Sequence, residues 1–213
     1  MAGAGKGKMY RCVATSEVGF IQQLAVGYVT HGHWFFVSGW IPEGKDPLLV
    51  DKKLIERYGI DISRWERARK KKAGSASVHY LRFERFFVLI STHGRHKFFD
   101  EEGKSIKDAR RTPIRALGYA ISFRGGHCHV RIDEAGYRRL KAVVEGAACH
   151  RRKEALESYI WELPFEPYAP VRRQVLNVWR AANRRRQEAG FEKLNVKCVR
   201  TKRKIVKPFS PAA

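Results

Sequence analysis

Acidic residues, paired cysteines and long hydrophobic runs are all scarce in this sequence of 213 residues. The four cysteines (Cys12, Cys128, Cys149 and Cys198) are far apart and form no Cys-x-x-Cys pair, which argues against a disulfide framework and a zinc finger. No stretch approaches the roughly 18 apolar residues that a membrane span needs, and the basic N-terminal segment lacks the apolar stretch of a secretory signal. We therefore expect an intracellular protein, cytoplasmic or associated with nucleic acid, that is not secreted and has no membrane partner.

Positive charge is what the sequence has in excess. It carries 43 Lys and Arg residues against 21 Asp and Glu residues, a formal net charge of +22 at pH 7. The hydrophobic fraction of 44% is that of a globular protein, so the charge does not indicate disorder. A folded domain with this excess repels itself, and the usual reason is a polyanionic partner, most often DNA or RNA. A soluble basic protein without such a partner is the plainer alternative.

The stretch from Leu117 to Ile132 predicts a β-hairpin. It centres on Gly125 and Gly126, a pair suited to a two-residue turn because both positions need positive φ. Since side chains alternate along a strand, the turn places six residues on one polar face: Ala120, Ser122, Arg124, His127, His129 and Arg131. The opposite face is apolar enough to cover a core, so we expect the polar face to point outward.

The remaining patterns predict an α+β fold. Strands are expected over residues 34–42, 77–83 and 85–93, and helices over 15–28, 51–58, 63–73, 154–163 and 170–190, with another helix starting at Asp133. The strand over 34–42 is apolar on both sides and should be central, covered on both faces. We expect an α+β core domain over residues 1–132, with a small, mainly antiparallel sheet packed against helices. A helical C-terminal region with a basic tail should follow over residues 133–213.

The basic residues are clustered. Ser63 and Glu66 form a capping box that opens the helix over 63–73, which is basic almost throughout. Like charges four residues apart repel each other within a helix, and a phosphate backbone would relieve this repulsion. A solvated helix face is the alternative. The predicted nucleic-acid contacts are Arg64, Arg67, Arg69, Lys70, Lys71, Lys72, Arg124, Arg131, Arg172, Arg173, Arg184, Arg185, Arg186, Lys202, Arg203 and Lys204.

Two further segments bear on this prediction. The tail over residues 197–209 is basic and β-branched, and we expect either an edge strand or an arm that orders on its partner. Trp161 and Trp179 lie beside basic residues and could stack on unpaired bases, but their helical spacing predicts a place in the core.

His127-Cys128-His129 is the most specific motif in the chain. Two histidines at i and i+2 share one strand face and can bind a single divalent cation. The motif resembles the paired-histidine strand of HUH nucleases, although Cys128 stands where that family has a larger hydrophobic residue. The resemblance implies His127 and His129 as ligands of Mg²⁺ or Mn²⁺, Tyr137 as the catalytic nucleophile and Lys141 as a phosphate contact. A different metal nuclease centre, built from the histidine pairs near residues 31–33 and 93–96, is a further alternative.

The leading hypothesis is a nucleic-acid-binding protein that contacts mainly the phosphate backbone of DNA or RNA. Such a protein belongs to a nucleoprotein complex, a ribonucleoprotein included, or to mobile-element machinery, with other proteins as partners. The polar hairpin face then supplies hydrogen bonds to phosphates, because guanidinium forks and imidazoles suit that role. The alternative from the enzyme class is a metal-dependent, HUH-like endonuclease that nicks or transfers strands. A hairpin face with no role beyond solvation is the third interpretation.

Overall fold

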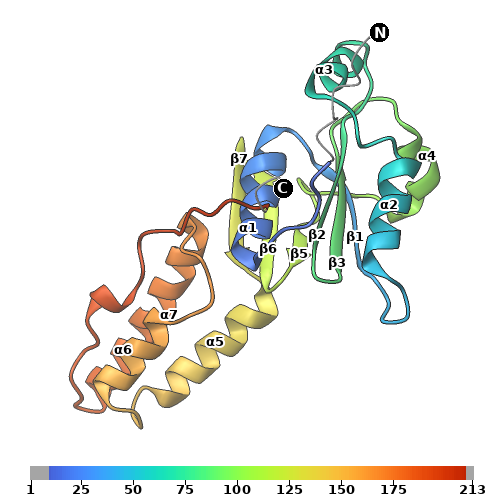
Figure 1. Ribbon diagram of the computed structural model, residues 1–213. Coiled ribbons are helices and arrows are strands. Elements are labelled where there is room, and N and C mark those ends of the chain that lie inside the picture. Colours follow the sequence, from blue (N-terminus) through green and yellow to red (C-terminus); the bar gives the residue numbers. More distant parts are fainter. Residues whose placement is uncertain (1–9, 210–213) are drawn as a thin grey trace.

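The computed structural model describes residues 10–209 of the chain (Figure 1). The basic N-terminal segment, for which we expect no secretory signal, lies mostly outside the described residues. The predicted α+β class is confirmed: antiparallel strands pack with helices, and a helical C-terminal region follows. The strands form two small sheets rather than the single sheet that we expected. None of the helices in the described part of the chain is long and apolar enough to cross a membrane.

The first sheet has the strand order β2-β3-β1-β4. Its strands are β1 (Phe35–Trp40), β2 (Val78–Phe83), β3 (Phe86–Ser91) and β4 (Lys107–Asp108), and all of its pairs are antiparallel. β3 is the most thoroughly buried strand, since its two neighbours are full-length. The prediction that β1 is central and covered on both faces is confirmed, because it lies between β3 and β4, Phe36 is buried in one hydrophobic cluster and Phe35 and Val37 on the other face pack against a second. Only its end is open, where Trp40 is 63% exposed.

The second sheet contains the predicted hairpin. It consists of β5 (Ile114–Ala116), β6 (Tyr119–Arg124) and β7 (His127–Ile132), in that order. The predicted register is confirmed, with Arg124 opposite His127 and Ser122 opposite His129. Gly125 and Gly126 adopt φ angles of 55° and 79° at the turn, where a residue with a Cβ atom would be strained.

In chain order the helices are α1 (Glu17–Gln22), η1 (Gln23–Tyr28), η2 (Val29–His31), α2 (Pro47–Arg57), α3 (Arg64–Lys72), α4 (Lys97–Glu102), η3 (Gly103–Ser105), α5 (Glu134–Ala147), α6 (Lys153–Trp161), α7 (Ala169–Glu188) and η4 (Val196–Cys198). Polar side chains cap the starts of α1 to α5, whereas α6 and α7 begin without a side-chain cap. The predicted caps Ser16, Ser63 and Asp133 each accept a backbone N–H of the first turn. α2 starts four residues earlier than expected, because Asp46 caps it and Pro47 fits its first turn.

Two hydrophobic clusters hold these elements together. The larger one joins α1, one face of the first sheet, the second sheet and the C-terminal helices, so that Ile121 and Ile132 share a cluster with Leu140, Val144 and Val175. The smaller one lies between the first sheet and α2 and includes Tyr58, Tyr80 and Phe98. The larger cluster therefore crosses residue 132, and the division into two regions at that position stays a prediction.

The C-terminal tail follows a path that the sequence did not indicate. It leaves the helical region and runs back to α1, as Figure 1 shows in dark red. The backbone N–H of Thr15 donates to the carbonyl of Pro208 at 3.0 Å, and the Gln22 amide donates to the carbonyl of Val206 at 2.9 Å. The edge strand is not observed, because the tail pairs with no strand of the described residues. An arm that orders on its partner stays a prediction.

Candidate nucleic-acid interface

A groove of about 1430 Å³ lies between α7 and the returning tail, and we call it the α7–tail groove. Residues from the end of α6, from one face of α7 and from the tail line it: Trp161, Glu162, Ala169, Arg172, Arg173, Leu176, Asn177, Arg180, Val196, Lys197, Val199, Arg200, Thr201, Lys202 and Lys204. Seven of these residues are basic and one is acidic. The groove is therefore a strongly cationic hollow between α7 and the tail.

The groove-lining face of α7 follows from the helical repeat. Arg172, Leu176 and Arg180 recur every four residues and so lie along one side of the helix. Val171 and Val175 are buried and belong to the other side, which packs on the larger core cluster. Because the apolar stripe fixes how α7 is rotated, the cations must face the tail.

The opposite wall is held in place by one buried carboxylate. Glu166 is 4% exposed, and it accepts a hydrogen bond of 2.7 Å from the backbone N–H of Lys204. It also forms an ion pair of 3.8 Å with Arg200, whose guanidinium donates to the carbonyls of Leu163 and Phe165, each at 2.6 Å. The backbone of the tail is thus anchored while the side chains of Lys202 and Lys204 stay exposed.

An aromatic side chain stands at the edge of the groove. The helical spacing predicted Trp161 to be in the core, and this was wrong, because the residue is 53% exposed at the end of α6. It lines both the α7–tail groove and a smaller adjoining hollow that also contains Lys197. An exposed indole beside cations matches the stacking platforms of proteins that bind single-stranded nucleic acids. Trp179 does pack against the core, and its Nε1–H donates to the carbonyl of Leu194 at 3.2 Å.

The predicted contacts on α7 and the tail separate into two groups. Arg172, Arg173, Lys202 and Lys204 line the groove. Arg203 lies over the ring of Tyr168, with its guanidinium carbon 4.6 Å from the ring centre. The structure also brings Arg180, Lys197 and Arg200 into the groove, although they are not among the predicted contacts. Arg180 could have been found because it lies eight residues, or two steps of four, after Arg172 on the same side of the helix. Lys197 and Arg200 could have been found because they begin the basic tail.

At the other end of α7, Arg186 has a structural place. It is 3% exposed and its guanidinium donates to the backbone carbonyls of Ala148, Arg151 and Glu192. This burial removes it from the candidate interface. Its position could have been anticipated, because it continues the buried stripe of α7 at intervals of four after Val178 and Ala182.

The two other predicted contacts of this cluster are exposed outside the groove. Arg184 is exposed, and exposed Arg185 donates to the carbonyl of Glu145 at 3.2 Å. Neither residue lines the α7–tail groove. They carry positive charge at the C-terminal end of α7, beyond the part of the helix that faces the tail.

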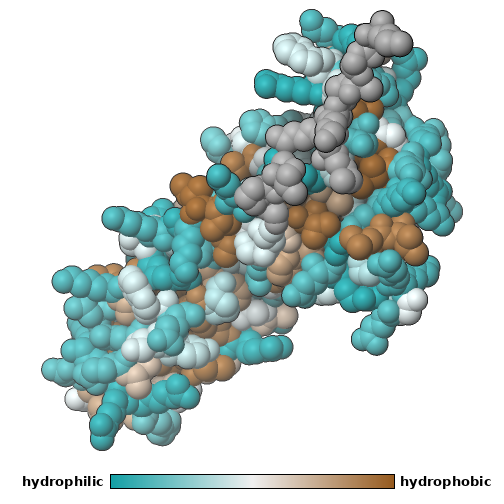
Figure 2. All heavy atoms as spheres, viewed as in Figure 1, coloured by the Kyte–Doolittle hydropathy of each residue, from teal (hydrophilic) through white to brown (hydrophobic). Residues whose placement is uncertain are grey.

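The basic helix α3 lies at the end of the molecule opposite the C-terminal helices (Figure 1). Its exposed cations are Arg64, Arg69, Lys70, Lys71 and Lys72, and Lys70 forms an ion pair of 3.2 Å with Glu66. Arg67 turns inward instead and donates to the carbonyls of Ile60 and Val78. Figure 2 shows hydrophilic side chains over α3 and over the C-terminal helices, with hydrophobic residues between them. The predicted cations therefore form separate patches.

The hairpin carries a third patch. Arg124, His127, His129 and Arg131 are exposed on one face of β6 and β7, as the alternation predicted, whereas Ala120 and Ser122 on the same predicted face are buried. On the opposite face Val130 and Ile132 are buried. The histidine pair therefore lies on the molecular surface and can reach a ligand.

The residues implied by the nuclease resemblance are only partly brought together. His127 and His129 share a face, but no group of three His, Cys, Asp or Glu residues suited to a metal ion occurs within residues 10–209. Tyr137 is half-buried and packs against the larger core cluster. Lys141 forms an exposed ion pair of 3.7 Å with Glu145. Of the histidines in the other proposed centre, His33 is buried against Tyr28 rather than near an acid.

No protein-family model matches the sequence, and no curated protein matches it either. The function must therefore be inferred from the geometry and electrostatics of the chain itself.

Proposed function

We propose that this protein binds nucleic acid, DNA or RNA, mainly through the phosphate backbone, and that the α7–tail groove is its principal binding site. One observation carries the proposal: seven basic residues and one acidic residue line a continuous groove whose walls are fixed by the core and by Glu166. A like-charged surface held rigid in this way repels itself, and a polyphosphate strand that releases its counterions relieves the repulsion. The exposed indole of Trp161 favours single strands, whose unpaired bases can stack on it.

The patches on α3 and on the hairpin extend the same function. They lie outside the groove and present Arg69, Lys72, Arg124 and Arg131 to solvent, together with their basic neighbours. Because phosphate contacts fix position without reading sequence, a protein of this kind tolerates many sequences. Such a protein fits a nucleoprotein complex or mobile-element machinery, in which it lies along a strand beside other proteins.

A charge-matched pair of variants tests the proposal. Lys202→Ala/Lys204→Ala removes two groove cations, and Lys52→Ala/Lys53→Ala removes two exposed cations from α2. We expect the first pair to weaken binding of a fluorescent single-stranded oligonucleotide about tenfold or more, and the second pair to change it by less than about twofold. Equal losses in both variants would show that affinity follows net charge alone and would overturn the assignment of the groove.

The exposed histidine pair supports a second candidate function. His127 and His129 point to the same side of β7, and they would be the ligands if an HUH-like endonuclease used Mg²⁺ or Mn²⁺ at this face. That enzyme would leave a covalent adduct between Tyr137 and labelled single-stranded DNA in the presence of Mn²⁺. Tyr137→Phe should abolish the adduct. No adduct in the wild type would leave strand binding as the function, and an adduct that persists in Tyr137→Phe would assign the attack to another residue.

A further inference from the structure

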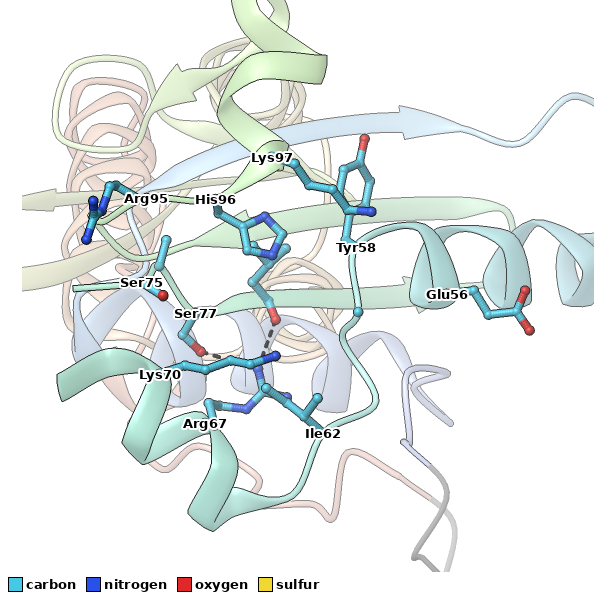
Figure 3. A pocket seen from close by; sticks show the side chains of 13 residues that line it. Glu56, Tyr58, Ile62, Arg67, Lys70, Ser75, Ser77, Arg95, His96 and Lys97 are labelled. Carbon is cyan, nitrogen blue, oxygen red and sulfur yellow. Dashed lines mark hydrogen bonds between the residues drawn. The ribbon is translucent and has the colours of Figure 1, made fainter. Parts of the chain in front are cut away.

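A second, smaller pocket lies at the opposite end of the molecule from the α7–tail groove. It has a volume of about 330 Å³ and is formed by the end of α2, the inner side of α3, the segment leading into β2 and the segment that follows β3 (Figure 3). We propose that this pocket binds a phosphomonoester group. The inference does not depend on the function of the groove, because the two sites share no residue.

Arg67 provides the central charge of the pocket. Its guanidinium donates to the carbonyl of Ile60 at 2.7 Å, to the carbonyl of Val78 at 3.1 Å and to the hydroxyl of Ser77 at 3.3 Å. All three acceptors are neutral, and no carboxylate among residues 10–209 forms an ion pair with it. The positive charge of a half-buried guanidinium with only neutral partners is not balanced, and an anion in the pocket would balance it.

The remaining lining adds positive charge and hydrogen-bond donors. Lys70 and Lys97 are exposed at the rim, and Ser75 supplies a hydroxyl. The Nδ1 atom of His96 accepts the backbone N–H of Phe98 at 3.0 Å, so the neutral ring carries its proton on Nε2. Figure 3 shows the His96 ring and the Lys70 side chain turned toward the hollow. The pocket therefore presents donors from three segments of the chain.

Little negative charge faces this pocket, although Glu66, which does not line it, pairs with the lining residue Lys70 at 3.2 Å. Glu56 is its only acidic lining residue, and its exposed carboxylate pairs with Lys52 at 3.9 Å. Figure 3 shows that carboxylate pointing away from the hollow, as the Arg95 guanidinium also does. The positive field also acts on nearby histidines. Burial lowers the pKa of His96, and the charges of Lys97 and Lys70 lower it further, although the backbone carbonyl of Tyr58 opposes the shift.

The size of the pocket limits its ligand. A volume of about 330 Å³ lies at the lower end of the range for small-molecule sites and admits a phosphate with an attached sugar, but not a duplex. A phosphomonoester carries close to two negative charges at pH 7, which match the Arg67 guanidinium and the Lys97 ammonium, with the Lys70 ammonium, shared with Glu66, as a third group. The same chemistry has two sources: the terminal phosphate of a nucleic-acid strand and the phosphate of a free mononucleotide.

The test uses inorganic phosphate, dTMP and two oligonucleotides that differ only in a 5′-phosphate or a 5′-hydroxyl. In the full-length protein, inorganic phosphate should shift the backbone amide NMR signals of residues 75–78 and 95–97. Lys70→Gln/Lys97→Gln should weaken phosphate binding about tenfold or more, through the loss of charge-assisted hydrogen bonds. The matched control Lys71→Gln/Lys72→Gln removes the same charge from the exposed side of α3 and should change binding by less than about twofold.

The oligonucleotides identify the source. Tighter binding of the 5′-phosphorylated strand, lost in Lys70→Gln/Lys97→Gln, supports a strand terminus as the ligand. Saturable binding of dTMP at the same amides, with no preference between the two strands, supports a free nucleotide. The groove variant Lys202→Ala/Lys204→Ala should retain phosphate binding. The experiment can therefore distinguish failure of the proposal for the groove from failure of the proposal for the pocket. The proposal is overturned if phosphate moves none of these amides, or if the control variant loses as much affinity as the pocket variant.

Discussion

The salt dependence of strand binding is the most quantitative consequence of the groove. Seven basic residues line it, and Arg200 is already held by two backbone carbonyls and Glu166, which leaves six cations for phosphates. For a single strand the slope of log affinity against log salt is about −0.7 for each phosphate neutralised, so six contacts give a slope of about −4. Raising the salt from 50 to 200 mM should then weaken binding about 300-fold.

The variant Lys202→Ala/Lys204→Ala tests the same relation between the number of groove cations and the salt slope. With four cations left the slope should be about −3, and the same change in salt should weaken binding only about 50-fold. Fluorescence anisotropy of a labelled oligo(dT) strand, measured at four salt concentrations, gives both slopes. The control variant Lys52→Ala/Lys53→Ala should keep the wild-type slope. The reasoning fails if the wild-type slope is shallower than about −1, or if the groove and control variants have the same slope.

Three further predictions follow from single features of the structure. Trp161→Ala should weaken single-strand binding about 5- to 150-fold without changing the salt slope, because stacking is worth about 1–3 kcal/mol per base, whereas exposed Trp40→Ala should not weaken it. Asp51→Asn should lower the free energy of unfolding in urea by about 3–5 kcal/mol, because the buried carboxylate accepts three hydrogen bonds of 2.7 Å from Tyr80 and Arg82. Burial lowers the pKa of His33 to about 4 and that of His79 to about 2, so both stay neutral in the folded protein at pH 5. Since their unfolded-state pKa is near 6.5, stability should fall as the pH drops below 6.5, by about 1.4 kcal/mol per pH unit for each ring.

Each of these predictions has a direct control. A loss of affinity in Trp40→Ala equal to that in Trp161→Ala would argue against stacking at the groove. Asp61→Asn changes an exposed carboxylate and should leave the free energy of unfolding within about 0.5 kcal/mol of the wild type. For the histidines, NMR signals of the His33 and His79 rings that titrate near pH 6.5 would contradict their neutral, buried state.

Local signals in the sequence were sufficient for much of the fold. The hairpin was predicted with its register because a Gly-Gly turn and the alternation of side chains are both local, and they fix which residues face each other. Ser63 and Asp133 marked helix starts for the same reason. The two-sheet arrangement was missed, because it depends on which strands meet in space and not on any one segment.

The candidate site depends on long-range contacts and was therefore predicted only in part. Clusters of arginine and lysine marked the correct segments, but they did not separate Arg186, which is buried, from Arg180, which lines the groove. The path of the tail is fixed by Glu166, which lies 38 residues before the Lys204 N–H that it accepts. Nothing in the local sequence of a basic tail indicates where such a partner lies.

The energetic cost of the groove is the strongest reason to assign it a function. The positive charges of α7 and the tail face each other across the α7–tail groove and repel, which favours separation of the two segments. The fold holds them together with buried contacts: the Asn183 side chain exchanges two hydrogen bonds with the backbone of Leu194, and the Glu166 carboxylate fixes the backbone of Lys204 and pairs with Arg200. These contacts stabilise the walls without neutralising Lys202 or Lys204. A groove whose walls are anchored by these contacts and left positively charged is preorganised for a polyanion, and a nucleic-acid backbone is such an anion.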